Sequence, residues 1–139
     1  GSTGNGRRQS YRHRPLVRMR NTYMLGGNTP PDDIIKDTQK GIYAVDYSGG
    51  QVDPSSGKFV FQATEAYLVE NGKITAPVKG ATLIGSCTKG LLNIDMIGND
   101  MTLERSGGTC GKKGQGVPVN DGMPTVRMTK GVTIGGTES

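Results

Sequence analysis

The sequence has few of the residues that build the common catalytic and structural sites. Its 139 residues include no tryptophan, one histidine and two cysteines, and aromatic residues make up only 5%. Because His13 is the single histidine, no Ser-His-Asp or Cys-His arrangement can form except through it. The two cysteines, Cys87 and Cys110, lack Cys-x-x-Cys spacing, which excludes a self-contained zinc site and a disulfide scaffold.

Long hydrophobic runs are also absent. The longest stretch without a charged residue, residues 21–31, contains two glycines and two prolines, so it does not predict a membrane-spanning helix. No basic region followed by an apolar segment opens the chain. Together with the low cysteine content, these features predict a soluble cytoplasmic protein with no membrane partner.

Positive charge is concentrated at one end of the chain. Residues 1–20 contain six arginines and no acidic residue, whereas the remaining residues carry a net charge of −1. Such a segment could contact nucleic acid phosphates. However, charged and apolar residues alternate from Pro15 to Arg20, which is typical of a strand with one solvated face. Nucleic acid is therefore the less favoured partner.

The abundant residues indicate many turns. With 23 glycines and 7 prolines, the composition favours short strands over long helices. We expect an α+β, β-rich fold with a mainly antiparallel sheet, sandwich or barrel-like, and one or two short helices. Residues 1–14 are expected to form a basic, extended and poorly packed N-terminal segment, and residues 15–139 a single β-rich domain.

Local patterns place the individual elements. Thr29 is expected to cap a helix over residues 30–38 with Pro30 at its first position, and residues 88–97 are expected to form a second helix. Asn71-Gly72 predicts a hairpin turn with Glu70 opposite Lys73, and residues 48–50 a tight reversal. Strands are expected over residues 16–24, 41–47, 58–70, 74–78, 81–84, 101–104, 117–119, 125–128 and 132–134.

The glycine-rich segment 106–116 surrounds a cysteine. It fails as a phosphate-binding loop because Ser106 replaces the first glycine and Lys113 the final hydroxyl residue of that motif. Glycines allow close approach of a ligand to Cys110, and neighbouring lysines favour its thiolate form. A plain packing role for this cysteine is the competing interpretation. Neither interpretation assigns a role to Cys87 or His13.

Several segments, in order, carry a resemblance to a known family. They are residues 4–11 (GNGRRQSY), 18–23 (RMRNTY), 70–74 (ENGKI), 77–85 (PVKGATLIG) and 110–119 (CGKKGQGVPV). Together they resemble the C-terminal part of TldD/PmbA family proteins. The resemblance implies a zinc metallopeptidase, formerly described as a modulator of DNA gyrase, that works with a TldE homologue on unfolded or extended peptides.

The resemblance also implies a site. In TldD-like members, zinc is bound by two histidines of a His-Glu-x-x-x-His helix and by a cysteine that matches Cys110, in a loop where Gly108, Thr109 and Gly111 are its neighbours. That motif is absent here, and the family places it upstream. We therefore expect zinc only in the full-length protein, no catalytic residue within this chain, and no activity of the isolated chain.

Two further functions stay open. The first is a non-catalytic TldE/PmbA-like scaffold or peptide-binding module, in which metal plays no part. The second is nucleic acid association through the N-terminal arginines. The expected partners are a peptide substrate and a homologous TldE/PmbA subunit or a second copy of the chain.

Overall fold

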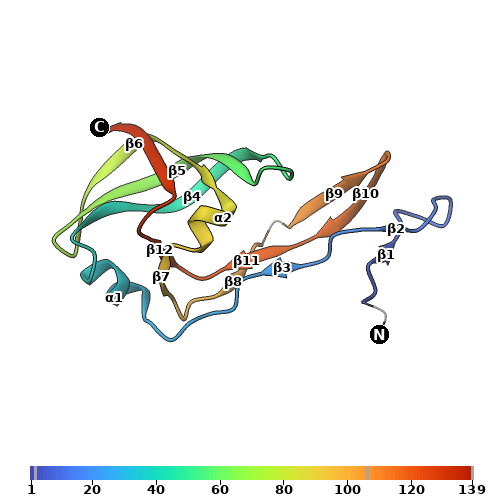
Figure 1. Ribbon diagram of the computed structural model, residues 1–139, viewed down its shortest axis with the longest axis horizontal. Coiled ribbons are helices and arrows are strands. Elements are labelled where there is room, and N and C mark those ends of the chain that lie inside the picture. The colour runs from blue at the N-terminus through green and yellow to red at the C-terminus, as the bar shows by residue number, and fades with distance from the viewer. Residues whose placement is uncertain (2, 106, 139) are drawn as a thin grey trace. The chain divides into compact units, whose positions relative to one another are not determined.

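The computed structural model describes residues 1–139 except residues 2, 106 and 139 (Figure 1). Backbone contacts divide the chain into two compact units. Unit 1 combines Gly1–Gly26 with Asp100–Pro124, and unit 2 combines Gly27–Asn99 with Thr125–Ser139. Each unit is therefore built from two separate stretches of sequence.

Unit 2 is built on a four-stranded antiparallel sheet. Its order is β13-β6-β5-β4, formed by β4 (Lys40–Val52), β5 (Lys58–Glu70), β6 (Lys73–Ser86) and β13 (Val132–Glu138). The predicted hairpin is confirmed, because Asn71 and Gly72 have φ of 50° and 75° and Glu70 lies opposite Lys73. The two strands predicted over residues 74–78 and 81–84 form the single strand β6.

The reversal expected at residues 48–50 is wrong. These residues lie inside β4, where the register against β5 shifts between Tyr47 and Gly50. A Cβ atom on Gly50 would lie 2.5 Å from the Val60 carbonyl oxygen, so glycine here permits close approach of two strands. The chain reverses after Asp53 instead, where Asp53 Oδ1 accepts a hydrogen bond from the Ser55 N–H at 2.8 Å.

The first predicted helix is confirmed in place, but its start differs. Helix α1 spans Pro31–Lys36, Pro30 is its N-cap, and no side chain caps it. Thr29 is therefore not the cap. A residue before proline is disfavoured in the α region, so Pro30 stays extended (φ −58°, ψ 137°) ahead of Pro31.

The second predicted helix is only partly correct. Helix α2 covers Cys87–Leu91, and β7 (Ile94–Ile97) follows it as a strand. Strand β7 pairs antiparallel with β12 (Val126–Met128). The apolar spacing of residues 91–97 fits a helix as well as a strand, and pairing with a distant segment decides the outcome.

Unit 1 consists of short strands in separate small sheets. Its strands are β1 (Gly6–Arg7), β2 (Leu16–Val17), β3 (Thr22–Tyr23), β8 (Thr102–Leu103), β9 (Gly108–Lys112), β10 (Gln115–Val119) and β11 (Asp121–Met123). Strand β2 pairs with β1, and β9 with β10. Strand β11 lies between β3, to which it is parallel, and the antiparallel β8.

The strand expected over residues 16–24 is therefore split between two sheets, because β2 pairs with β1 and β3 pairs with β11. The predicted class is confirmed: the fold is β-rich α+β, with mainly antiparallel sheets and two short helices. Among the described residues, no sheet closes into a barrel.

The core consists mainly of small side chains. In unit 2, Ala63, Ala66 and Ala81 form a buried cluster, against which Ile42, Ala44 and Val78 pack. In the described part of unit 1, the buried hydrophobic residue is Val117. Unit 1 therefore has little apolar burial to hold it together, and its polar contacts carry more of its organisation.

Candidate functional site around Cys110

The segment expected to be a glycine-rich loop is a β-hairpin. Strands β9 and β10 are joined by Lys113 and Gly114, whose φ values of 47° and 71° are those of a tight hairpin turn. Cys110 lies in the middle of β9, opposite Val117. Gly108, Thr109 and Gly111 lie on the same strand, so the predicted site residues share a paired strand and not a mobile loop.

Arg18 lies against this hairpin. It is 3% exposed, and its Nη2 donates to the carbonyl oxygens of Cys110 and of Gln115, the latter at 2.9 Å. The expectation that the charged residues of this strand face solvent is wrong at this position, because the charged Arg18 is buried and the apolar Val17 beside it is 72% exposed. The alternation of charged and apolar residues is real, but Arg18 faces inward. Periodicity alone could not have shown this, since the contacts are 92 or more residues away along the chain.

The surroundings of Cys110 favour its thiolate. A backbone N–H of Met19, then the Arg18 side chain, lower the pKa of the Cys110 thiol by hydrogen bonding, and the charges of Arg18 and Lys112 add to this. Lys112 Nζ also donates to the Val17 carbonyl at 3.1 Å. The sequence predicted that the neighbouring lysines lower the pKa of the Cys110 thiol, but the largest contributions to this lowering come from Met19 and Arg18.

Two glutamines join the N-terminal segment to the hairpin. The Gly116 N–H donates to Gln9 Oε1 at 2.7 Å, and the buried Gln115 accepts from the Gln9 N–H at 3.3 Å. Gln115 Nε2 also donates to the Arg14 carbonyl at 3.1 Å. Sequence reasoning missed these residues, and only their position within the segments that resemble the family signalled them.

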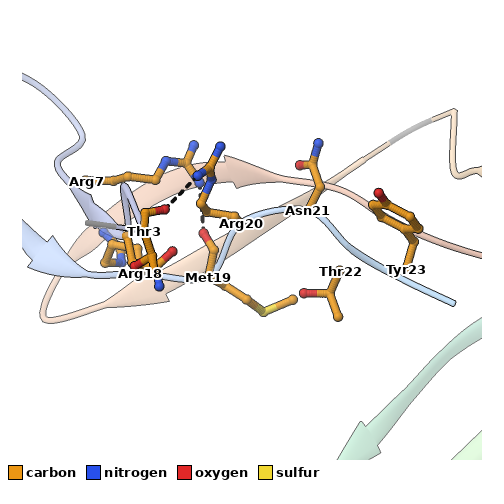
Figure 2. A pocket seen from close by; sticks show the side chains of 9 residues that line it. Thr3, Arg7, Arg18, Met19, Arg20, Asn21, Thr22 and Tyr23 are labelled. Atoms are coloured by element: carbon orange, nitrogen blue, oxygen red, sulfur yellow. Dashed lines mark hydrogen bonds between the residues drawn. The ribbon is translucent and has the colours of Figure 1, made fainter. Parts of the chain in front are cut away.

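An open pocket of about 760 Å³ lies next to this network in unit 1. It is lined by Arg7, Arg18 and Arg20 together with Asn5, Asn21 and Tyr23, among others. Figure 2 shows Arg7 and Arg20 near one end of the pocket and Tyr23 at the other, along the extended backbone between them.

The other candidate residues lie apart from this arrangement. His13 Nδ1 is 2.8 Å from Ser10 Oγ in the N-terminal segment. Cys87 begins α2 in unit 2, where its N–H donates to the Gly57 carbonyl at 2.8 Å. Both cysteines are free thiols. Within the described residues, no three His, Cys, Asp or Glu side chains come together as a metal site, and no helix is long and apolar enough to span a membrane.

Residues 1–136 match the family described as the PmbA/TldA metallopeptidase C-terminal domain. The chain belongs to this family. It is 54% identical to a metalloprotease TldD homologue of Buchnera aphidicola over 136 residues, 98% of this chain and 28% of that protein. It is 39% identical to a zinc metalloprotease TldD homologue of Saccharolobus solfataricus over 134 residues, 96% of this chain and 29% of that protein.

Solved structures share the fold. TldE from Thermococcus kodakarensis superposes with a TM-score of 0.74 at 19% identity, over 96% of this chain and 27% of that one. A putative modulator of DNA gyrase from Bacteroides thetaiotaomicron gives 0.63 at 27% identity, over 83% and 23%. The family resemblance inferred from the sequence is thus confirmed. The chain spans less than a third of each of these relatives.

Proposed function

We propose that this chain is the C-terminal part of a TldD-like zinc metallopeptidase, in which Cys110 is one zinc ligand and unit 1 forms part of the peptide-binding cleft. The observation that carries the proposal is the position of Cys110 on a paired strand, with the Met19 N–H and Arg18 favouring its thiolate. The names of the relatives as metalloproteases, one of them a zinc metalloprotease, support it.

The chemistry of this donor fits zinc. Thiolate is one of the ligands that zinc prefers, and Cys110 is only partly buried, so its sulfur is not committed to a core. A catalytic zinc needs three protein ligands and one open position. The two histidines would come from the His-Glu-x-x-x-His motif that the resemblance implies, outside residues 1–139. When bound, zinc lowers the pKa of its water and polarises a carbonyl group.

The residues of this chain would hold the ligand in place. Arg18 ties the Cys110 carbonyl on β9 to the Gln115 carbonyl on β10, which fixes the two strands relative to each other. Arg7 adds a second connection, because its Nη2 donates to the Pro118 carbonyl at 2.7 Å. Groups that orient a ligand in this way typically change metal affinity by about 10–100-fold when they are removed. Arg18 is thus a positioning residue in this account.

We infer a cytoplasmic protein, since its two cysteines are free thiols. Its partners would be an extended peptide substrate and a TldE/PmbA-like subunit or a second copy of the chain, as the similarity to a TldE structure suggests. This proposal assigns no role to a nucleic acid.

The test is a pair of matched cysteine substitutions in the full-length protein. Cys110→Ala should leave folding largely intact, reduce zinc below one equivalent and abolish peptide cleavage, because it removes a ligand. Cys87→Ala, in unit 2, should keep both zinc and activity. The isolated 139-residue chain should hold no stoichiometric zinc and cleave no peptide. If Cys110→Ala kept full zinc content and activity, the non-catalytic scaffold would become the leading function.

A further inference from the structure

The pocket of unit 1 lies in a strongly basic part of the chain. Unit 1 has nine lysines and arginines against three acidic residues, a net charge of +6. Three ion pairs, Lys36–Asp33, Arg127–Asp37 and Arg127–Asp95, lie within unit 2. None of the pocket arginines takes part in these pairs.

The guanidinium groups of the pocket bind neutral carbonyl oxygens. Arg7 Nη1 donates to the Met19 carbonyl at 2.8 Å, and Arg20 Nη1 donates to the Thr3 carbonyl at 2.8 Å. These bonds orient the two side chains, and a carbonyl oxygen has no formal charge to balance that of a guanidinium group. Gly4 has a φ of 68°, and a Cβ atom there would lie 3.1 Å from Arg20 Nη1, so glycine gives Arg20 its room.

Arg18 is the most unusual of these side chains. It is almost fully buried, lines the pocket, and has two nitrogens, Nε and Nη1, without a hydrogen-bond partner in the described structure. A buried guanidinium with unpaired donors is costly unless an anion lies close to it. A cluster of this kind therefore favours a negatively charged ligand.

We propose that the pocket bounded by Arg7, Arg18 and Arg20 binds a carboxylate of an extended peptide. Guanidinium groups pair with carboxylates through charge-assisted hydrogen bonds. The neighbouring Asn21 still has its amide NH₂ to donate, since its Oδ1 accepts from the Asn120 N–H at 3.1 Å. The ligand class rests on the proposed peptidase function, but the anion preference rests on the pocket itself.

The shape and position of the pocket favour a peptide over a nucleic acid. The three other N-terminal arginines, Arg8, Arg12 and Arg14, do not line it, so the charge forms one compact cluster and not a row along a backbone. Figure 2 shows the arginines near one end and Tyr23 at the other, joined by extended chain. A peptide could place its carboxylate at the arginines and an apolar side chain at Tyr23. Arg18 also connects this pocket to Cys110.

The test measures peptide binding to the full-length protein after zinc has been removed with a chelator, so that no cleavage occurs. Fluorescence anisotropy compares a short unstructured peptide with a free C-terminus, its C-terminal amide, and an amidated peptide with one internal glutamate. The peptide with the free C-terminus, the peptide with the internal glutamate, or both should bind about tenfold more tightly than the neutral amide. A charge-assisted hydrogen bond changes affinity by about that factor. Preference for the free acid identifies the terminal carboxylate, and preference for the internal glutamate an acidic side chain.

Arg20→Gln is the informative substitution, because Arg20 is exposed and its Nη1 donates to the carbonyl oxygen of Thr3, another residue that lines the pocket. It should remove the preference for acidic peptides, and Arg20→Lys should keep part of it. Arg8→Gln makes the same charge change outside the pocket and should keep the preference in full. Circular dichroism confirms that each variant is folded.

Equal binding of neutral and acidic peptides would overturn the proposal, and so would an unchanged preference for acidic peptides in Arg20→Gln. Binding of single-stranded DNA is measured in the same way. The proposal would also be overturned if the wild type bound this DNA, Arg20→Gln did not, and neither showed a preference for acidic peptides. That result would assign the pocket to nucleic acid. Zinc content separates this inference from the proposed function. If Cys110→Ala kept its zinc, only the zinc-ligand role of Cys110 would be refuted. The preference for acidic peptides is measured on the zinc-free protein, so it tests the pocket independently of that role.

Discussion

The two units of this chain are held together by different kinds of contact. Unit 2 has three strands of 13 or 14 residues around a cluster of buried alanines, and it contains three ion pairs. Unit 1 has strands of two to five residues and a net charge of +6. Its arginines and glutamines bond to backbone groups far along the chain, such as Arg7 to Pro118.

This difference leads to different expectations for substitutions in the two units. Long paired strands and a small-residue core stabilise unit 2 through many contacts that no single side chain dominates. In unit 1, a few polar side chains hold the hairpin of Cys110, and some of these side chains also bring positive charge to a pocket. Substitutions should therefore reduce stability most in unit 2 and alter binding most in unit 1.

The largest expected loss of stability is found by comparing glycine substitutions in two hairpin turns, one in each unit. Gly72 in unit 2 and Gly114 in unit 1 have similar φ values of 75° and 71°, but a Cβ atom on Gly72 would lie 2.5 Å from the Lys36 carbonyl oxygen, whereas Gly114 has nothing within 4 Å. Gly114→Ala should cost about 1 kcal/mol from backbone strain, and Gly72→Ala about 3 kcal/mol because the clash adds to that strain. Urea denaturation measures both, and equal costs would refute the contrast.

A smaller effect compares two valines on the same strand of unit 2. Val69 is 3% exposed and Val60 is 45% exposed, both on β5. Val69→Ala should lower the free energy of unfolding by about 2 kcal/mol, since it opens a cavity, while Val60→Ala should cost about 0.5 kcal/mol or less. Thermal unfolding checks the order. A larger loss for Val60→Ala would show that the core of unit 2 lies elsewhere.

The smallest effect concerns acid. Arg127 holds the pKa of Asp95 below its usual range through hydrogen bonds at 2.7 and 2.9 Å. A carboxyl group whose pKa is lowered in the folded state stabilises the fold above its unfolded pKa of about 3.9, and this stability is lost as the pH falls through the folded pKa. Arg127→Met should therefore cost about 1 kcal/mol at neutral pH and less in strong acid.

Lys36→Met is the control for this acid prediction. Lys36 pairs with Asp33 at 3.1 Å, but both side chains are largely exposed. Its loss should change the melting temperature little at either pH, because solvent screens such a pair. If the melting temperatures of wild type and Arg127→Met differed as much in strong acid as at neutral pH, the carboxylate pairs would not be the cause.

Within unit 2, local signals predicted some elements and missed others. The bounds of β5 and the Asn71-Gly72 turn follow from alternation and turn chemistry within a few residues. The bulge in β4 and the strand β7 depend on distant pairing, such as Ile97 with Val126, and a local pattern cannot show which partner is present. Tertiary pairing therefore overrode the weak helical spacing after Leu91.

The candidate site was predictable only in part, and for the same reason. The resemblance to the family pointed to Cys110, but the hairpin on which it lies is contacted by Arg18 and Gln9, which lie about a hundred residues earlier. The buried position of Arg18 is contrary to what its charge predicts, because buried arginines are rare without an anionic partner. Such exceptions to sequence rules are expected where binding sites are built.

The central claim, that Cys110 is a metal ligand, is tested most directly by cobalt. The full-length protein would be loaded with cobalt(II) in place of zinc. A thiolate ligand of cobalt(II) gives a charge-transfer absorption band in the near ultraviolet, which zinc does not give. We predict this band in the wild type and in Cys87→Ser, and its loss in Cys110→Ser. A band of unchanged intensity in Cys110→Ser would contradict the account.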